Sequence, residues 1–377
     1  MTAPPWISCL EKALCELAQE YDPAAAITAF AFHPLYRVGV ARESFDHIEK
    51  LFGKSCWGRL KHYSGNLARL DWPQYVGKKW QVPLPKDSII FFKDDKEGVI
   101  VASHEKQIVL KLFFNPQSVE LLEKEIETLK SIMETPFAPY SVQLLGEGKT
   151  SNGARWFVSQ FCSNTLSIKN EPFPERFLLK QFPHMIMPAM TEFYKAHPFE
   201  VQPLAQWLKS AEERINNHPA QGLLKKLIQA IKREEQKFPR YDVLHAHIHH
   251  DLHAGNILRD EKQMVIIDWE GNVRGLVLVD IWDFSRRYMR AHRLTRFMFW
   301  LYLKGIVKGL PKLVKKSLDF YRQWMAENFL AQVPEGSERL SMLLYVLERT
   351  LIIYELRGLD RMKDKKGFEA QVMSSLS

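Results

Sequence analysis

The chain has 377 residues, of which 46% are hydrophobic and 25% are charged. This length suffices for two domains or two large lobes, and the composition excludes collagen-like, largely disordered and disulfide-scaffold proteins. The four cysteines, Cys9, Cys15, Cys56 and Cys162, form no CxxC pair and no zinc spacing, which fits a reducing compartment. Neither a secretory signal nor an apolar run of membrane-spanning length is evident, so we expect a cytoplasmic protein.

The net charge of +8 is a local feature of the sequence. Residues 286–316 contain ten of the 52 Lys and Arg residues and neither Asp nor Glu, so the remaining chain has 42 basic and 44 acidic residues. A local excess of this kind indicates an acidic surface or substrate and not a chain-wide nucleic-acid coat. No nucleic-acid partner is therefore expected.

Residues 1–85 indicate helical pieces interrupted by prolines, and we treat them as an N-terminal extension of unknown role. At Ser88 the pattern changes to short β-rich runs. Three such runs, separated by short turns, predict an antiparallel meander over residues 88–92, 98–103 and 107–114.

A helix is expected after the meander, because apolar residues recur at three- and four-residue spacing at Val119, Leu122, Ile126 and Leu129. Two further strand-like runs cover 141–148 and 155–161, and the patterns from Cys162 onward are mainly helical. The sequence therefore predicts an α+β fold. A small lobe over 86–161, with an antiparallel sheet and one helix, precedes a larger, mainly helical lobe over 162–377.

The segment richest in chemically active side chains is LHAHIHHDLHAGNILRDEKQMVIIDWEG, Leu244–Gly271. It contains Asp251, then Asn256 five residues later, and then Asp268 at the end of the apolar run VIID. Phosphoryl transfer from ATP needs a divalent metal to neutralise the phosphates and a carboxylate to orient the attacking hydroxyl. Because Mg²⁺ prefers oxygen ligands, a carboxylate and an amide oxygen are suitable ligands for it.

Residues 249–258, HHDLHAGNIL, resemble the H-G-D-L-H-x-G-N-x-L catalytic loop of the aminoglycoside phosphotransferase and choline kinase-like family. These enzymes phosphorylate small molecules and are related to the protein kinases. Residues 266–270, IIDWE, resemble the metal-binding segment of the same family. The sequence departs from the pattern at His250, where the family usually has Gly, and at Ala254, where it often has Pro.

The resemblance implies a protein-kinase-like, two-lobed fold, with ATP and Mg²⁺ as cofactors. It implies that Asp251 is the catalytic base and that Asn256 and Asp268 bind magnesium, and we expect His249 and His253 to orient the catalytic loop, residues 249–256.

The predicted small lobe contains a candidate pair for the nucleotide phosphates. Kinase-like folds hold the α- and β-phosphates with a Lys on the third strand, paired with a Glu on the following helix. Lys111 lies within the apolar run IVLKLFF, where a charge is costly unless it is paired. Glu125 lies on the inward-facing stripe of the predicted helix and is its expected partner.

Other parts of the kinase pattern are weaker. The turn where kinases place a glycine-rich, phosphate-covering loop is Asp94-Asp95-Lys96-Glu97-Gly98, which has one Gly and three acids. Phe161 and Cys162 resemble the hinge where adenine would meet backbone groups. Asp280 matches the D-x-W of protein kinases and Asp283 the D-L-A of small-molecule kinases; both are interpreted as structural supports of the catalytic loop.

A zinc hydrolase is a second interpretation of the same segment. Five histidines within nine positions come close to an H-x-H-x-D-H zinc motif: His245, His247, His249, His250 and His253. The motif is not matched, because Leu252 stands where its last His is required. We expect His245 and His247 to be packing or surface residues.

The basic segment 286–316 interleaves cations with large apolar residues. It is either a helix with a solvated basic edge or a site for an anionic membrane or glycolipid. The sequence thus predicts an ATP- and Mg²⁺-dependent kinase that phosphorylates a hydroxyl of a small molecule or sugar. A kinase of lipopolysaccharide or glycolipid sugars, peripheral to the inner face of the membrane, is an alternative. A protein-substrate kinase and a non-catalytic kinase-like binding module also remain open.

Overall fold

The computed structural model describes residues 9–10, 12–17, 28–33, 38–41, 80–82, 88–93, 97–103, 105–162, 166–167, 184–216, 218, 221–238, 240–253, 255–259, 264–283 and 312–357. The chain divides into two compact units. Unit 1 consists of residues 1–130 and 142–164, and unit 2 of residues 131–141 and 165–377.

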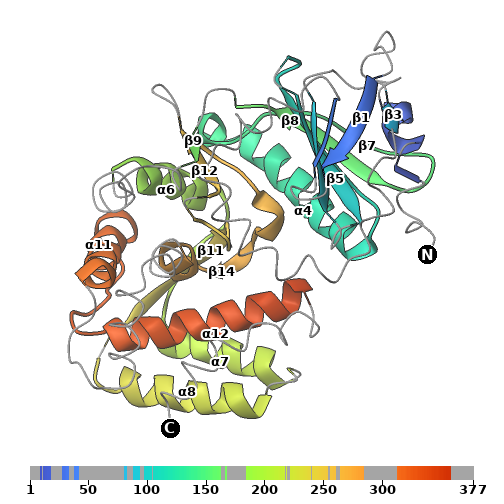
Figure 1. Cartoon of the computed structure of the whole chain (residues 1–377). Helices are drawn as coiled ribbons and strands as arrows, with labels where there is room; N and C mark the ends of the chain where they lie inside the picture. Colours follow the sequence, from blue (N-terminus) through green and yellow to red (C-terminus); the bar gives the residue numbers. More distant parts are fainter. Residues whose placement is uncertain are drawn as a thin grey trace. The chain divides into compact units, whose positions relative to one another are not determined.

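Unit 1 is built on an antiparallel sheet of eight strands, in the order β3-β1-β2-β4-β5-β6-β8-β7 (Figure 1). The strands are β1 (Thr28–His33), β2 (Val38–Ala41), β3 (Trp80–Val82), β4 (Ile89–Lys93), β5 (Gly98–Ser103), β6 (Ile108–Phe113), β7 (Leu144–Lys149) and β8 (Arg155–Gln160). Helix α4 (Pro116–Met133) follows β6, as the apolar spacing predicts.

Strands β1, β2 and β3 correct one expectation. Residues 1–85 were expected to form helical pieces, yet these three strands extend the predicted meander, because β1 pairs with β2 and β3, and β2 pairs with β4. The run TAFAFH of β1 has the aromatic content that strands favour, and the prolines nearby punctuate strands as well as helices. Among the described residues of this stretch, only 9–10 and 12–17 are helical.

The two faces of the central strands bury different elements. Side chains alternate along a strand, so Leu110 and Leu112 of β6 share one face and Lys111 occupies the other. The leucine face packs against the amino-terminal helical residues, of which Leu10 and Leu14 are completely buried. This short helix therefore closes the face of the sheet that α4 does not cover.

Unit 2 is mainly helical. Its longer helices are α6 (Met187–Ala196), α7 (Leu204–Asn216), α8 (Gln221–Glu235), α11 (Lys312–Phe329) and α12 (Glu338–Arg357), with the 3-10 turns η4 (Ala138–Tyr140) and η7 (Trp269–Gly271). The strands are β9 (Leu166–Ser167), β10 (Glu200–Pro203), β11 (Asp242–Ile248), β12 (Ile257–Arg259), β13 (Met264–Ile266) and β14 (Val273–Leu276).

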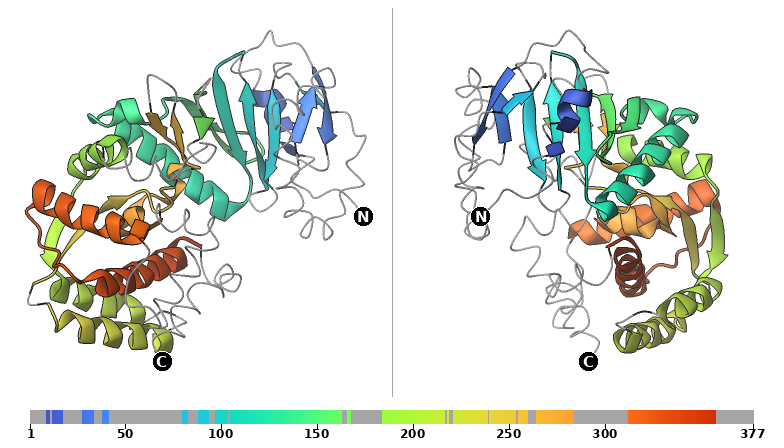
Figure 2. Two further views of the ribbon diagram at one scale, coloured as in Figure 1. Left: turned by 60° about the vertical axis from the view of Figure 1, so that its left-hand side comes forward. Right: turned by 90° about the vertical axis from the view of Figure 1, so that its right-hand side faces the viewer.

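These strands form two small antiparallel sheets, β10-β11-β14 and β13-β12-β9. Helix α12 packs against α7, α8 and β14, as the views in Figures 1 and 2 show. Along this helix, most residues from Leu340 to Ile353 are buried. Residues 342–353 of α12 therefore form the centre of the core of unit 2.

The predicted α+β class is confirmed, with an antiparallel sheet in unit 1 and a mainly helical unit 2. No helix in the described part of the chain is both long and apolar enough to cross a membrane. Of the basic segment 286–316, residues 286–311 lie outside the described residues, and residues 312–316 begin α11.

The first prediction concerns Gly98, at the start of β5. A Cβ atom there would lie 2.1 Å from the carbonyl oxygen of Leu112 and 2.9 Å from the Cα of Phe113, and neither backbone atom can move cheaply. Gly98→Ala should therefore lower the free energy of unfolding by about 3 kcal/mol, measured by urea denaturation. Gly222→Ala in α8, where a Cβ meets nothing within 4 Å, is the matched control and should leave stability equal or higher. Equal stability of the two variants would contradict the packing argument.

Candidate active site

The loop between β11 and β12 carries Asp251 and Asn256. Strands β12 and β13 form a hairpin in which Ile257 lies opposite Ile266, and the N–H of Ile267 donates to the carbonyl of Asn256 over 2.9 Å. This register places Asn256 and Asp268 at the same end of the hairpin. The local pairing of two short strands thus brings together residues twelve positions apart.

Asn256 and Asp268 offer oxygen atoms that suit a magnesium ion. The side-chain Nδ2 of Asn256, a buried residue, donates to the carbonyl of Asp251 over 3.1 Å, so the amide group is oriented by its donor side. Asp268 has a left-handed backbone, with φ 69° and ψ 58°. Such a conformation is costly outside glycine and occurs mostly where surrounding contacts enforce it, frequently at functional sites.

His249 is completely buried, and both of its ring nitrogens have partners. Nε2 lies 2.9 Å from the carbonyl of Ile267, and Nδ1 accepts from the N–H of Asp251 at 3.4 Å. The ring also packs against Trp269, with centroids 4.6 Å apart. The imidazole therefore connects the loop to the segment that carries Asp268.

His253 faces the carboxylate of Asp251. Its Nε2 lies 3.6 Å from Asp251 Oδ2, while its Nδ1 accepts from the N–H of Gly255 at 2.8 Å. Because Nδ1 is an acceptor, a neutral ring carries its hydrogen on Nε2, toward Asp251. A Cβ at Gly255 would lie 2.7 Å from the ring, so a larger residue at this position would displace the His253 imidazole.

The carboxylate of Asp280 accepts hydrogen bonds from the backbone of the catalytic loop. It is fully buried and accepts from the N–H groups of His249 at 2.9 Å and His250 at 2.7 Å, and from the hydroxyl of Tyr194 at 3.0 Å. Burial raises the pKa of Asp280, and these donors oppose that change. Two of these three donors belong to the loop, so the buried carboxylate restrains the loop backbone at His249 and His250.

Asp283 lies one helical turn after Asp280 and is equally buried. It accepts from the hydroxyl of Tyr345 at 2.6 Å and forms an ion pair with Arg349. Sequence reasoning left the two aspartates as alternatives. The structure gives the direct contact to Asp280 and an indirect one, through α12, to Asp283.

In unit 1, Lys111 and Glu125 form the expected ion pair. Lys111 Nζ lies 2.8 Å from each carboxylate oxygen, and the Glu125 side chain is 3% exposed. The Lys111 ammonium also lies 5.6 Å from the centre of the Phe157 ring. Removal of one partner from a buried ion pair of this kind strongly destabilises the folded protein, because the other charge is left unpaired.

The remaining predicted residues of unit 1 are placed in part. Phe161 and Cys162 follow β8 and are half-buried, and the N–H of Phe161 donates to the carbonyl of Gln107 over 2.8 Å. Of the acidic turn, Asp94, Asp95 and Lys96 lie outside the described residues. The role of Phe161 and Cys162 in adenine binding stays a prediction, and no residue of the acidic turn is assigned to the phosphates.

The histidine-rich strand β11 does not form a zinc site. Among the described residues, no group of three His, Cys, Asp or Glu side chains that includes a histidine has ligand atoms close enough for one metal ion. His245 and His247 instead share one face of β11, beside Arg274 of β14. Burial, together with Arg274 and Arg214, lowers the pKa of His245 to about 4.

Two residues that hold the loop were missed by the sequence reasoning. Tyr194 of α6 donates to Asp280, and Arg349 of α12 donates to the carbonyl of His250 over 3.3 Å. For Arg349 a signal existed in the sequence. The adjacent charged residues Glu348 and Arg349 interrupt a long apolar run, and a buried charge needs a partner. No comparable signal marks Tyr194.

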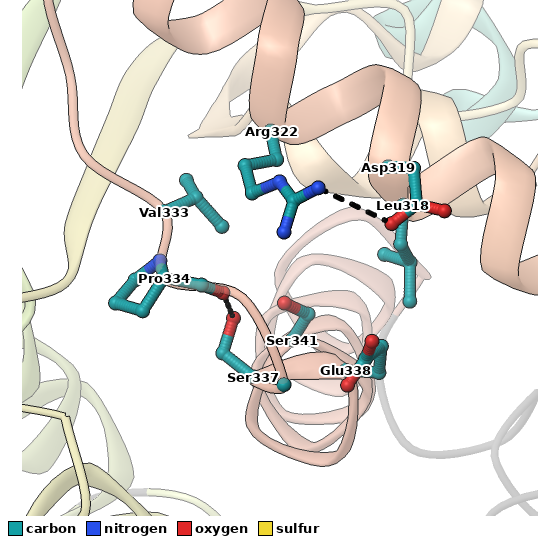
Figure 3. A pocket seen from close by; sticks show the side chains of 9 residues that line it. Leu318, Asp319, Arg322, Val333, Pro334, Ser337, Glu338 and Ser341 are labelled. Carbon is teal, nitrogen blue, oxygen red and sulfur yellow. Dashed lines mark hydrogen bonds and ion pairs between the residues drawn. The ribbon is translucent and has the colours of Figure 1, made fainter. Parts of the chain in front are cut away.

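A small pocket lies where α11 meets the start of α12 (Figure 3). Its polar groups are already paired. Arg322 lies 3.6 Å from Asp319, the hydroxyl of Ser337 donates to the carbonyl of Pro334, and Ser341 Oγ lies 2.7 Å from the hydroxyl of Tyr241. None of the lining residues belongs to the catalytic loop, and we assign no ligand to this pocket.

Residues 183–297, which include the catalytic loop and the Asp268 segment, match the family described as "Phosphotransferase enzyme family". The chain resembles this family. The resemblance predicted from the sequence motifs is thereby confirmed, and it supports an enzyme of the kinase or phosphotransferase class. Among curated proteins, none matches this sequence significantly.

Solved structures with similar arrangements share little sequence with the chain. One is a thermostable mutant of aminoglycoside phosphotransferase APH(4)-Ia in a ternary complex with AMP-PNP and hygromycin B (13% identity, 78% of this chain and 94% of that chain, TM-score 0.47). A glucosamine kinase has 13% identity over 78% of this chain and 77% of its own, with a TM-score of 0.39. A choline/ethanolamine kinase family protein from Mesorhizobium loti has 14% identity over 74% and 89%, with a TM-score of 0.33.

The second prediction follows from the low pKa of His245, about 4 against an ordinary 6.5. Between these values the unfolded chain binds more protons than the folded chain, so the free energy of unfolding falls as the pH drops below 6.5. Above that pH the contribution is absent. His245→Asn cannot take up the proton and should reduce the difference between the urea midpoints at pH 7 and pH 5.

The control is His184→Asn, which removes an exposed imidazole. It should keep the wild-type difference between the two midpoints. If both variants retain the full difference, His245 is not a source of acid sensitivity.

Proposed function

We propose that the chain is an ATP- and Mg²⁺-dependent phosphotransferase that transfers the γ-phosphate to a hydroxyl group of a small molecule or sugar. The observation that carries this proposal is the loop of unit 2. There the β12–β13 hairpin brings Asn256 and Asp268 to one end, and the Asn256 side chain bonds the carbonyl of Asp251, within the segment that matches the phosphotransferase family.

The proposed roles follow from the position and chemistry of each side chain. Asp251 is 26% exposed, so an acceptor can reach its carboxylate. It accepts the hydroxyl proton as the acceptor oxygen bonds to the γ-phosphorus, while the bond from that phosphorus to the β–γ bridging oxygen breaks. His253 Nε2 faces this carboxylate at 3.6 Å.

Asn256 and Asp268 would hold the magnesium ion, which neutralises charge on the β- and γ-phosphates when it is bound. Lys111, oriented by Glu125, would contact the α- and β-phosphates, since a Lys ammonium paired with a helix Glu serves this purpose in kinases. Phe161 and Cys162 would meet the adenine through backbone groups. His249, Asp280 and Asp283 would keep the loop in its working geometry.

A second candidate function is phosphorylation of a glycolipid sugar at a membrane surface. The observation that favours it is the charge of residues 286–316, with ten cations and no acid. An anionic lipid headgroup would complement such a segment, whereas a polycationic antibiotic would not. Vesicles containing anionic glycolipid therefore belong in the panel of acceptors, beside sugars and amino alcohols.

The non-catalytic binding module is the remaining rival. A scaffold has no need for all of Lys111, Glu125, Asp251, Asn256 and Asp268, and the chain retains all five. Retention of the complete set favours an enzyme.

The third prediction concerns Asp251→Ala, tested with radiolabelled ATP against the acceptor panel. Transfer should fall by about 10³-fold, because the base is lost, while ATP affinity stays unchanged because Asp251 is not a proposed metal or nucleotide ligand. Asp319→Ala, which removes an exposed carboxylate of α11, is the control and should transfer at the wild-type rate. Full turnover by Asp251→Ala would refute the assigned base.

A further inference from the structure

We propose that Arg349, on helix α12, is a positioning residue for Asp251. The proposal rests on the proposed function, since it concerns the same loop. Arg349 is 99 positions from His250 in sequence, and its guanidinium donates to the carbonyl of His250, which belongs to the peptide unit that leads into Asp251.

The peptide groups around His250 are held from two sides by buried charges of opposite sign. Asp280 accepts from the N–H of His250 at 2.7 Å, and Arg349 Nη1 donates to its carbonyl at 3.3 Å. His250 has a φ of 66°, a left-handed conformation that disfavours side chains other than glycine. Because that conformation is costly, it persists only where surrounding contacts enforce it, and these two contacts act directly on the strained residue.

Arg349 is itself oriented by its environment. Its side chain is 10% exposed and forms an ion pair with Asp283, whose side chain is 1% exposed. Asp283 in turn accepts from Tyr345, which lies one helical turn before Arg349 on α12. The guanidinium is therefore fixed relative to α12 and the helical residues 278–283 before it reaches the loop.

The neighbouring residue on α12 provides a natural control. Glu348 is also completely buried and forms an ion pair with Arg214 of α7 at 2.7 Å. Its other oxygen accepts from the N–H of Leu276 in β14. This pair has the same charges, with Arg214 23% exposed against 10% for Arg349, and it links α12 to α7 and β14 and not to the loop.

The experiment compares Arg349→Gln and Arg349→Lys with Arg214→Gln in the full-length protein. Hydrogen exchange followed by mass spectrometry measures protection of the loop amides of residues 249–256. Steady-state hydrolysis of Mg-ATP, by phosphate release, measures kcat and KM. Calorimetry with Mg-ATP measures nucleotide binding in each variant.

Arg349→Gln should exchange the loop amides about tenfold faster and lower kcat by about 10- to 100-fold, because small displacements of a catalytic group are costly, with KM for Mg-ATP unchanged. Arg349→Lys keeps the charge but not the planar fork, and should recover part of the loss. Arg214→Gln should lower the urea midpoint, with loop exchange and kcat as in the wild type.

Loop exchange or kcat in Arg349→Gln that matches Arg214→Gln would overturn the proposal and leave Arg349 a structural residue. A failure of the proposed function has a different appearance. In that case the wild type itself neither binds nor hydrolyses Mg-ATP, and the exchange comparison alone decides whether Arg349 holds the loop.

Discussion

The buried carboxylate of Asp280 is the constraint on which the candidate site depends. A fully buried carboxylate is costly unless its oxygens accept hydrogen bonds. Here the donors are two N–H groups of the catalytic loop and the hydroxyl of Tyr194. The same bonds that make the charge tolerable fix the backbone at His249 and His250. Because Asp251 is the next residue, the carboxylate determines where the proposed base points. From Asp251 the loop continues to Asn256, which directly precedes the β12–β13 hairpin.

Two described residues of the candidate site have left-handed backbones: His250 in the catalytic loop and Asp268 shortly after β13. In the family that the sequence resembles, the first position is usually glycine, which adopts this conformation at little cost. A histidine there costs about 1 kcal/mol or more, and it is tolerated because its peptide groups bond Asp280 and Arg349. In unit 1 a costly feature is also offset by its contacts, because the charges of Lys111 and Glu125 pair with each other.

Much of this arrangement could be predicted from the sequence, and the limits have a physical cause. The meander, α4 and the Lys111–Glu125 pair follow from local periodicity and from the rule that a charge in an apolar strand needs a partner. The strands β1 to β3 were not predicted, because they are short and lie among prolines that punctuate helices and strands alike. Tyr194 contacts Asp280 from 86 positions away, Arg349 contacts His250 from 99 positions away, and no local spacing encodes such contacts. The choice between Asp280 and Asp283 depended on which carboxylate faces the loop, a matter of tertiary packing.

The proposed function requires that the chain bind ATP through a magnesium ion held by Asn256 and Asp268. Calorimetric titration of the full-length protein with ATP, in Mg²⁺ and then with a chelator, tests it most directly, with Asp268→Asn as the matched variant of equal size. The account predicts binding in Mg²⁺ that the chelator abolishes and that Asp268→Asn weakens at least about tenfold. Absence of binding in the wild type, or binding that neither the chelator nor the substitution changes, would contradict it.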